Sequence, residues 1–271
     1  MTLWQNPRWF SEHKRRELLD DHVTSTGEAR FGLRTFRENE KVEAVRRHFN
    51  RVASKYDFMN SLLSFGIQNA WKRAAIRRLQ IRPGEKVLDV CGGTGDLAIL
   101  AAHRTGPAGR VVIYDINWAM IQAGRPKIDP HPSLDHIDYV QGDAEQIAFP
   151  ANTFDVAMVG FGIRNLTHLK QGFREMHRVL KPGGRLLCLE FSKPHNPVFR
   201  SLYDFYSFNI MPLLGEVITG SAQSYACLPE TIRMFPLPGE LCTMLSAIGF
   251  RQVTYRAMTN AIAVAHVGFK V

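Results

Sequence analysis

The sequence is poor in cysteine and has no long apolar run. Four cysteines occur among 271 residues, without a CxxC pair. This argues against a disulfide framework and a zinc site, fits a reducing compartment, and leads us to expect no bound metal. No stretch of eighteen uncharged apolar residues occurs, so we expect no membrane span. There is no internal repeat, but 45% of the residues are hydrophobic, which suffices for a large core.

The first third of the chain has too few acidic residues to balance its basic ones. Residues 1–82 hold 17 Lys and Arg against 9 Asp and Glu, a net charge of +8, whereas residues 83–271 have a net charge of +1. Two interpretations stay open. One is a solvated helical surface, and the other is contact with an anionic membrane surface or an acidic partner. Nucleic acid is disfavoured, because no aromatic stacking platforms lie among the basic residues.

The chain divides into three predicted parts. In residues 1–37 the apolar residues have no regular spacing, which indicates an irregular N-terminal arm. The acidic residues of this arm argue against an intact targeting peptide. Residues 38–82 have the spacing of two basic helices, at 38–56 and about 69–79. In the second helix Trp71 is expected to face inward and Lys72 outward. Pro83-Gly84 then opens a domain over residues 83–271.

Strand and helix patterns alternate through this domain. Strands are expected near 86–90, 110–114, 137–140, 154–159 and 185–191, and helices near 96–104, 117–125 and 168–179. A helix at about 239–247 precedes two strands, 252–257 and 261–269, which the turn-forming Thr259-Asn260 joins into an antiparallel hairpin. We therefore predict an α/β fold, with a mostly parallel, Rossmann-like sheet of seven strands and helices on both faces.

An aromatic insertion at about 197–233 departs from this alternation. It contains Phe199, Tyr203 and Tyr206 and follows the fifth strand, where open α/β sheets bind ligands. Both a packed helical cap and a lid over an apolar substrate fit the pattern.

The most informative motif is the run of residues 87–96. An apolar strand stops at Gly92, Gly93 and Gly95, and a helical pattern begins. Such glycines let the backbone approach a ligand, and the helix start offers free N–H groups. Asp115, twenty positions after Gly95, ends the next apolar run, where a carboxylate can accept both hydroxyls of a ribose.

Three further features favour S-adenosylmethionine over a dinucleotide. Asp89 precedes the glycines, Asp143 follows the third strand, and Pro182-Gly183-Gly184 leads into the fifth strand. Together they resemble the signature of class I S-adenosylmethionine methyltransferases, with Cys91 at the first glycine position. A sulfonium and an ammonium also favour a cleft lined by carboxylates more than a pyrophosphate does.

Longer motifs narrow the resemblance. Residues 51–60 (RVASKYDFMN), 161–165 (FGIRN), 189–194 (LEFSKP) and 230–234 (ETIRM) are similar to the ubiquinone/menaquinone biosynthesis C-methyltransferases. The resemblance covers residues 38–271. The extension before residue 38 and the longer segment 126–136 make it closest to the mitochondrial, eukaryotic branch of that family.

This resemblance implies methyl transfer from S-adenosylmethionine to a ring carbon of a prenylated methoxy-benzoquinol. The family's cofactor positions fall on Thr94, Asp115, Asp143 and Ala144, and Tyr56 is expected to cover the methionine end. With the glycine motif, the expected cofactor-binding residues are Asp89, Gly93, Thr94, Gly95, Asp115, Asp143, Ala144 and Tyr56.

The ring carbon becomes nucleophilic only when the neighbouring phenol, with a pKa near 10, loses its proton. Arg164 is the leading candidate to stabilise the phenolate or polarise a water, since its guanidinium stays charged. A salt bridge that holds the loop is the competing role. Asn165 could orient the same oxygen, and Tyr203 is a weaker catalytic candidate.

A prenylated substrate implies peripheral attachment to an anionic membrane surface, expected on the matrix side of the mitochondrial inner membrane. Other enzymes of quinone biosynthesis and a second copy of the chain are expected partners. Two alternatives stay open: an NAD-dependent oxidoreductase, and a non-enzymatic scaffold in a biosynthetic complex.

Overall fold

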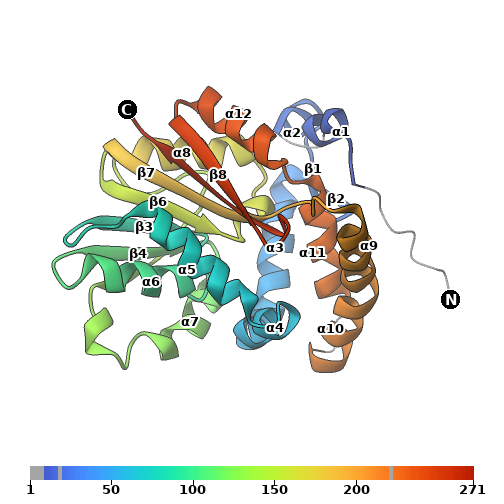
Figure 1. Cartoon of the computed structure of the whole chain (residues 1–271), viewed down its shortest axis with the longest axis horizontal. Helices are drawn as coiled ribbons and strands as arrows, with labels where there is room; N and C mark the ends of the chain where they lie inside the picture. Colours follow the sequence, from blue (N-terminus) through green and yellow to red (C-terminus); the bar gives the residue numbers. More distant parts are fainter. Residues whose placement is uncertain (1–8, 18–19, 220–221) are drawn as a thin grey trace.

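A seven-stranded sheet forms the centre of the molecule (Figure 1). The computed structural model describes residues 9–17, 20–219 and 222–271. The strand order is β5-β4-β3-β6-β7-β9-β8, with β9 antiparallel to both of its neighbours. The strands are β3 (Lys86–Val90), β4 (Arg110–Asp115), β5 (Ile137–Gln141), β6 (Phe154–Gly160), β7 (Leu180–Phe191), β8 (Arg251–Met258) and β9 (Ala263–Phe269). The predicted α/β sheet with its C-terminal hairpin is confirmed.

Alternate residues of the strands build two cores, one on each face of the sheet. Val87 packs with helices α5, α6 and α7, whereas its neighbour Leu88 packs with α8 and α12. This follows from the two-residue period of a strand. The helices are α5 (Ile67–Leu79), α6 (Asp96–Thr105), α7 (Trp118–Gly124), α8 (Leu169–Val179) and α12 (Pro238–Ile248). Short 3-10 turns lie at Arg125–Lys127, Pro132–Leu134 and Ile163–Asn165.

The prediction of an irregular arm over residues 1–37 is wrong for the part that the structure describes. This part forms α1 (Glu12–Glu17), α2 (Asp20–Thr26) and a hairpin of β1 (Glu28–Phe31) with β2 (Arg34–Arg37). The Leu33 amide donates to Glu230 Oε2 at 2.8 Å, and Arg15 pairs with Glu240. Contacts with distant elements order this part of the chain, and the spacing of apolar residues within it does not reveal such contacts.

The predicted first helix is divided in two. Helix α3 (Glu38–Val52) ends at a 3-10 turn (Ala53–Lys55), and α4 (Tyr56–Leu63) continues in another direction. Trp71 is buried as expected, but the outward placement of Lys72 is wrong. Lys72 Nζ is buried against Asp96 Oδ2 at 2.7 Å, so the ion pair offsets the cost of burying its charge.

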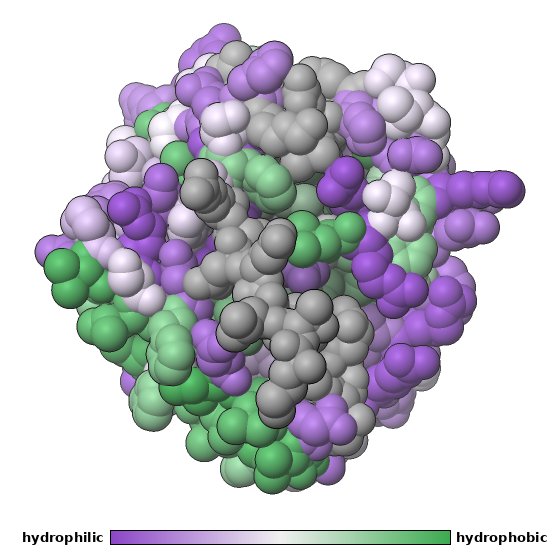
Figure 2. Space-filling model, turned by 90° about the vertical axis from the view of Figure 1, so that its right-hand side faces the viewer, coloured by the Kyte–Doolittle hydropathy of each residue, from purple (hydrophilic) through white to green (hydrophobic). Residues whose placement is uncertain are grey.

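The insertion forms a helical layer beside the sheet. It comprises α9 (Pro197–Phe205), a π-helical turn (Tyr206–Ile210), α10 (Met211–Thr219) and α11 (Ala222–Met234). Figure 1 shows α3 between the sheet and these helices. On the face turned to the viewer in Figure 2, hydrophobic residues gather at the lower left.

Within the described residues, no helix has both the length and the apolar character needed to cross a bilayer. The domain limits at residues 37 and 82 stay a prediction.

Candidate active site

The predicted glycine motif lies at the point where the strand order reverses. Strand β3 pairs with β4 on one side and with β6 on the other, so the loops after β3 and β6 border one crevice. The loop has positive φ at Cys91 (+53°), Gly93 (+54°) and Gly95 (+82°). Because the backbone at Cys91 is left-handed, the conformation at this position favours glycine, which is the residue that the methyltransferase signature has here.

Asp115 anchors the glycine loop from the neighbouring strand. Its Oδ2 accepts the Gly93 amide at 2.9 Å, and its Oδ1 accepts the Asn117 amide at 2.8 Å. Burial raises the pKa of this carboxyl to about 6, although both hydrogen bonds oppose the shift. Asp115 is therefore held at a fixed place but is easily protonated in the ligand-free protein.

This gives a prediction for cofactor affinity. Two ribose hydroxyls need the ionised carboxylate as acceptor, so binding below about pH 6 requires Asp115 to release a proton. We expect the affinity for S-adenosylhomocysteine to be flat above about pH 7 and to fall by up to about tenfold per pH unit well below pH 6. Calorimetric titration across this range checks it. Asp115→Asn should bind weakly with little pH dependence, and an equally steep profile in this variant would contradict the assignment.

Asp89 has an unusual environment for a carboxylate. It is buried, and its Oδ2 accepts the Ala98 amide at 3.0 Å, whereas its Oδ1 has no partner in the structure. Burial, followed by the nearby charges of Asp115 and Asp96, raises its pKa well above the usual range. An unpaired buried oxygen beside a cavity is a place for a donor or cation from a ligand.

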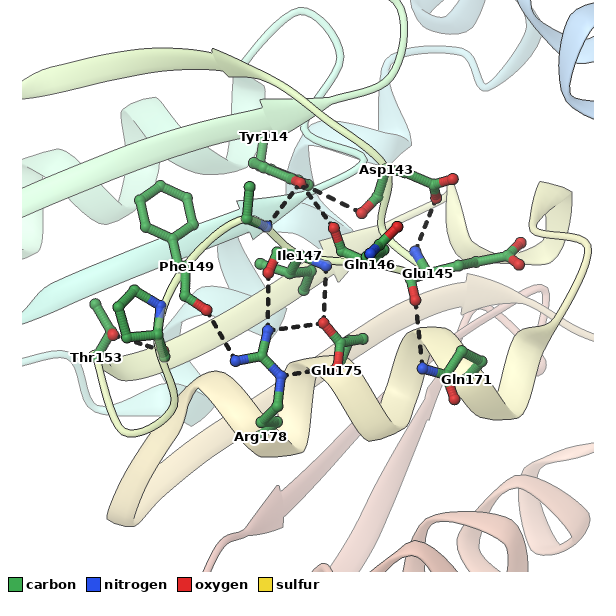
Figure 3. Close-up of polar contacts among 12 residues, drawn as sticks. Tyr114, Asp143, Glu145, Gln146, Ile147, Phe149, Thr153, Gln171, Glu175 and Arg178 are labelled. Carbon is green, nitrogen blue, oxygen red and sulfur yellow. Dashed lines mark hydrogen bonds and ion pairs between the residues drawn. The ribbon is translucent and has the colours of Figure 1, made fainter.

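Asp143 lies in the loop that follows β5, and Figure 3 shows the contacts of this loop. Its Oδ1 accepts the Glu145 amide at 2.8 Å, and the Tyr114 hydroxyl contacts its carbonyl oxygen at 3.3 Å. Farther along, Arg178 of α8 donates to the carbonyl of Ile147 at 2.8 Å and pairs with Glu175 at 2.7 Å. These bonds connect the loop to β4 and α8, so the position of Asp143 is fixed before any ligand binds.

Helix α4 contacts the glycine loop and covers one side of the site. Thr94 Oγ1 donates to Asp57 Oδ1 of α4 at 2.6 Å, and Lys127 Nζ lies 2.6 Å from both Asp57 and Asp96. Although burial alone would raise the pKa of Asp96, Lys72 and Lys127 together lower it. This charge network connects α4 to the start of α6. The sequence analysis missed it, because its members lie up to 70 residues apart.

Two adjoining cavities lie in the crevice. The larger has a volume of about 790 Å³ and a mainly apolar lining, and the smaller has about 90 Å³. Of the predicted residues, Asp89, Thr94, Arg164 and Tyr203 line the larger cavity; Asp115, Asp143 and Ala144 line the smaller; Gly93, Tyr56 and Asn165 line both. Gly95 lines neither. A Cβ there would approach Ile113 to 2.7 Å, so its place reflects packing, and its cofactor contact stays a prediction.

Arg164 is buried in an ion pair that the sequence analysis weighed as a competing role. Its Nη1 lies 3.0 Å from both carboxylate oxygens of Glu190, and it also donates to the Phe161 carbonyl. Its Nε has no partner, and its guanidinium lies 5.6 Å from the Phe191 ring centre. The salt bridge and a role toward a ligand are compatible, because Arg164 still lines the larger cavity while Glu190 lies behind it.

Glu190 is the main residue that the sequence analysis left without a role. The signal was present: an acidic residue ends the apolar run of β7, at the ligand side of the sheet. Burial raises the pKa of Glu190, and the charge of Arg164 opposes this shift.

His48 of α3 is a second residue of the site that the sequence did not indicate. It lines the larger cavity, and burial followed by the charge of Arg164 lowers its pKa to about 4, so it is neutral at pH 7.

The described residues fit S-adenosylmethionine. The unpaired Asp89 Oδ1 and the Asp115 carboxylate supply acceptors. Gly93 lines both cavities with no side chain of its own, and its positive φ favours glycine. Tyr56 lines both cavities, so its side chain can cover a ligand that extends from one into the other.

Known proteins resemble this chain along nearly its whole length. The model of the ubiE/COQ5 methyltransferase family matches residues 35–270. A ubiquinone/menaquinone biosynthesis C-methyltransferase of Ectopseudomonas mendocina is 48% identical over 240 residues, 89% of this chain and 94% of that protein. Its namesake from Shewanella sp. strain W3-18-1 is 46% identical over 249 residues, 91% of this chain and 99% of that protein.

Solved structures share the fold at low sequence identity. A SAM-dependent methyltransferase from Aquifex aeolicus has a TM-score of 0.54 at 17% identity, over 74% of this chain and 89% of its own. The [4+2]-cyclase SpnF has a TM-score of 0.61 at 15% identity, over 83% and 94%. The fold is therefore that of class I methyltransferases, and since a cyclase shares it, the fold alone does not define the reaction.

Proposed function

Because the chain belongs to the ubiE/COQ5 methyltransferase family, we propose that it methylates a ring carbon of a prenylated methoxy-benzoquinol in ubiquinone biosynthesis. The methyl donor is S-adenosylmethionine, which supplies a methyl group on a sulfonium. One observation carries the proposal: a carboxylate-lined cavity adjoins an apolar cavity that contains a buried arginine. The arrangement gives a cationic cofactor and a lipid acceptor adjoining places.

Each group of residues has a defined task. Asp115 accepts the ribose hydroxyls, Asp143 and the Ala144 backbone hold the adenine, and Asp89 faces the charged methionine end. Thr94 and Tyr56, on the two sides of the crevice, cover that end and exclude water. Water exclusion strengthens the electrostatic interactions within the site.

The acceptor side stabilises negative charge. The Arg164 guanidinium favours the phenolate over the phenol, and Asn165 orients the same oxygen toward it. Glu190 keeps Arg164 in place and offsets part of its charge. Arg164 cannot itself remove the proton at neutral pH, so its role is to stabilise the anion or to polarise a water. Tyr203, from α9, closes the apolar side of the cavity.

We further propose a mitochondrial location on the matrix side of the inner membrane. The N-terminal extension and the longer segment before β5 support the eukaryotic branch, although the relatives named above are bacterial. The basic N-terminal third supports attachment to an anionic membrane surface. Other quinone-biosynthesis enzymes and a second copy of the chain are the partners that this location implies.

The test is methylation of a short-chain methoxy-benzoquinol with S-adenosylmethionine under reducing conditions. We expect a C-methylated product, identified by mass spectrometry and NMR, and no product from the oxidised quinone, whose ring lacks a phenolate. The absence of product from the quinol would refute the proposal and would favour a scaffold. In a parallel titration, S-adenosylhomocysteine should bind, and tight binding of NADH alone would favour an oxidoreductase.

A further inference from the structure

Exposed apolar side chains occur on the elements that line the larger cavity. They come from α4, the following turn and the start of α5, and from the α9–α10 segment. We call this set the apolar rim. It comprises Phe58, Leu62, Phe65 and Ile67 on the first side, and Val198, Leu202, Phe205, Ile210, Leu213 and Val217 on the second. Figure 2 shows hydrophobic residues gathered on this side of the molecule.

The two sides of the rim form one surface. The Tyr206 hydroxyl donates to the Leu63 carbonyl at 2.8 Å, and the Tyr206 and Phe65 rings lie 6.1 Å apart. Phe65, Ile67 and Leu202 also line the larger cavity. The apolar lining of the cavity therefore continues into the exposed surface at these three residues.

Helix α9 has one broad apolar side, opposite the polar side formed by Arg200, Ser201 and Asp204. Phe199 and Tyr203, on one part of the apolar side, line the cavity. Val198, Leu202 and Phe205 follow the i, i+4, i+7 spacing on the adjoining part, and all three are exposed. In α10, the exposed Leu213 and Val217 repeat the spacing of four. The apolar side of a surface helix normally faces the core, whereas here part of it faces outward.

Phe65 is the most exposed member of the rim. Its side chain is 85% exposed at the turn between α4 and α5, and its φ is +50°. A bulky residue in the left-handed region is a conformational outlier. Neither water contact nor local backbone preference accounts for a phenylalanine at this position, whereas insertion into a lipid surface does.

The charges near the rim complement an anionic surface. Both carboxylates of α4 and α9 are in ion pairs, Asp57 with Lys127 and Asp204 with Arg233. The cations Arg51, Lys55 and Arg200 lie on or beside these helices, and Lys55 Nζ donates to the Ile218 carbonyl of α10 at 2.6 Å. Glu216 on α10 is the exposed carboxylate of this region.

We propose that the apolar rim inserts into the headgroup and upper acyl region of an anionic bilayer, and that the prenylated acceptor enters the cavity directly from the membrane. This inference rests on the proposed function for the identity of the acceptor. A cavity of about 790 Å³ has the size of a pocket for one drug-sized ligand and must also hold part of the cofactor. A long prenyl chain extends beyond it, and the rim keeps that chain out of water.

The test is the triple variant Phe205→Ser/Leu213→Ser/Val217→Ser, whose positions line neither cavity. Flotation with phosphatidylcholine–cardiolipin vesicles should show partitioning reduced at least about tenfold, because three apolar side chains no longer leave water. Methylation of a short-chain quinol in free solution should be unchanged, which also shows that the variant is folded. Methylation of a long-chain quinol in vesicles should fall with the partitioning.

The matched control is Leu33→Ser/Tyr255→Ser/Val271→Ser. It replaces a leucine, an aromatic residue and a valine that are exposed outside the rim. We expect wild-type partitioning from this control. Unchanged vesicle binding of the rim variant, or an equal loss in the control, would overturn the inference.

Oligomeric state supplies the other decisive outcome. If sedimentation velocity shows a dimer that the rim variant converts to a monomer while vesicle binding persists, a second copy covers the rim and the inference is wrong. A wild-type protein that floats with vesicles but does not methylate the short-chain quinol would contradict the proposed function and still support insertion of the rim.

Discussion

Arg164→Ala should lower kcat for quinol methylation by about 10²–10³-fold, the usual effect of removing one preorganised group that stabilises an oxyanion. The guanidinium lines the larger cavity, and among the described residues no other arginine lines it. Affinity for S-adenosylhomocysteine should change less than kcat, because Arg164 does not line the smaller cavity, where Asp115 and Asp143 are expected to hold the ribose and adenine. Steady-state kinetics and calorimetry separate the two effects.

Arg185→Ala is the matched control. Arg185 is also a largely buried arginine in an ion pair, with Glu85, but it lies in the middle of β7 and lines neither cavity. Its loss should reduce stability while kcat stays near the wild-type value. Arg164→Lys should recover part of the activity, since it keeps the charge but not the planar group. A wild-type kcat in Arg164→Ala would show that Arg164 serves only to form a structural salt bridge.

Glu190→Ala should lower the free energy of unfolding by about 3–5 kcal/mol, because it leaves the Arg164 guanidinium buried without its counter-ion. Glu190 and Arg164 side chains are 2% and 8% exposed, so the pair is shielded from solvent in the folded protein. Denaturant unfolding, followed by circular dichroism, measures the change.

Glu190→Gln distinguishes positioning from stability alone. The amide keeps a hydrogen-bond acceptor for Arg164 but removes the negative charge, so it should cost less stability than alanine. A freer guanidinium charge should also move the acid limb of the kcat–pH profile, where the phenol loses its proton, to lower pH. Glu43→Ala, in an exposed pair with Arg46, should cost less than about 1 kcal/mol. Equal losses in Glu190→Ala and Glu43→Ala would show that burial does not make the Glu190 pair important.

The sheet could be predicted because its signals are local. Short, mainly apolar runs, separated by glycine turns and helical periods, indicate β3 to β7, and Thr259-Asn260 indicates the final hairpin. Asp89 and Asp115 lie at the ends of β3 and β4, and Asp143 follows β5. Their approach to one crevice follows from the rule that the carboxyl ends of parallel strands meet at one edge.

Contacts between distant segments could not be predicted in this way. The β1–β2 hairpin is held by Glu230 of α11, and the turn of the chain at Val52 depends on packing between α3, α4 and the cap. The burial of Lys72 depends on Asp96, and that of Arg164 on Glu190. In each pair the charged residue alone indicates an exposed surface, and only its partner makes burial possible.

A crystal structure with S-adenosylhomocysteine and a short-chain quinol analogue would test the central claim most directly. We predict that the ribose contacts Asp115 in the smaller cavity and that the quinol ring lies in the larger cavity, with a phenol oxygen within hydrogen-bonding distance of Arg164. A quinol ring bound away from Arg164, or a cofactor bound outside the crevice between β3 and β6, would contradict the account.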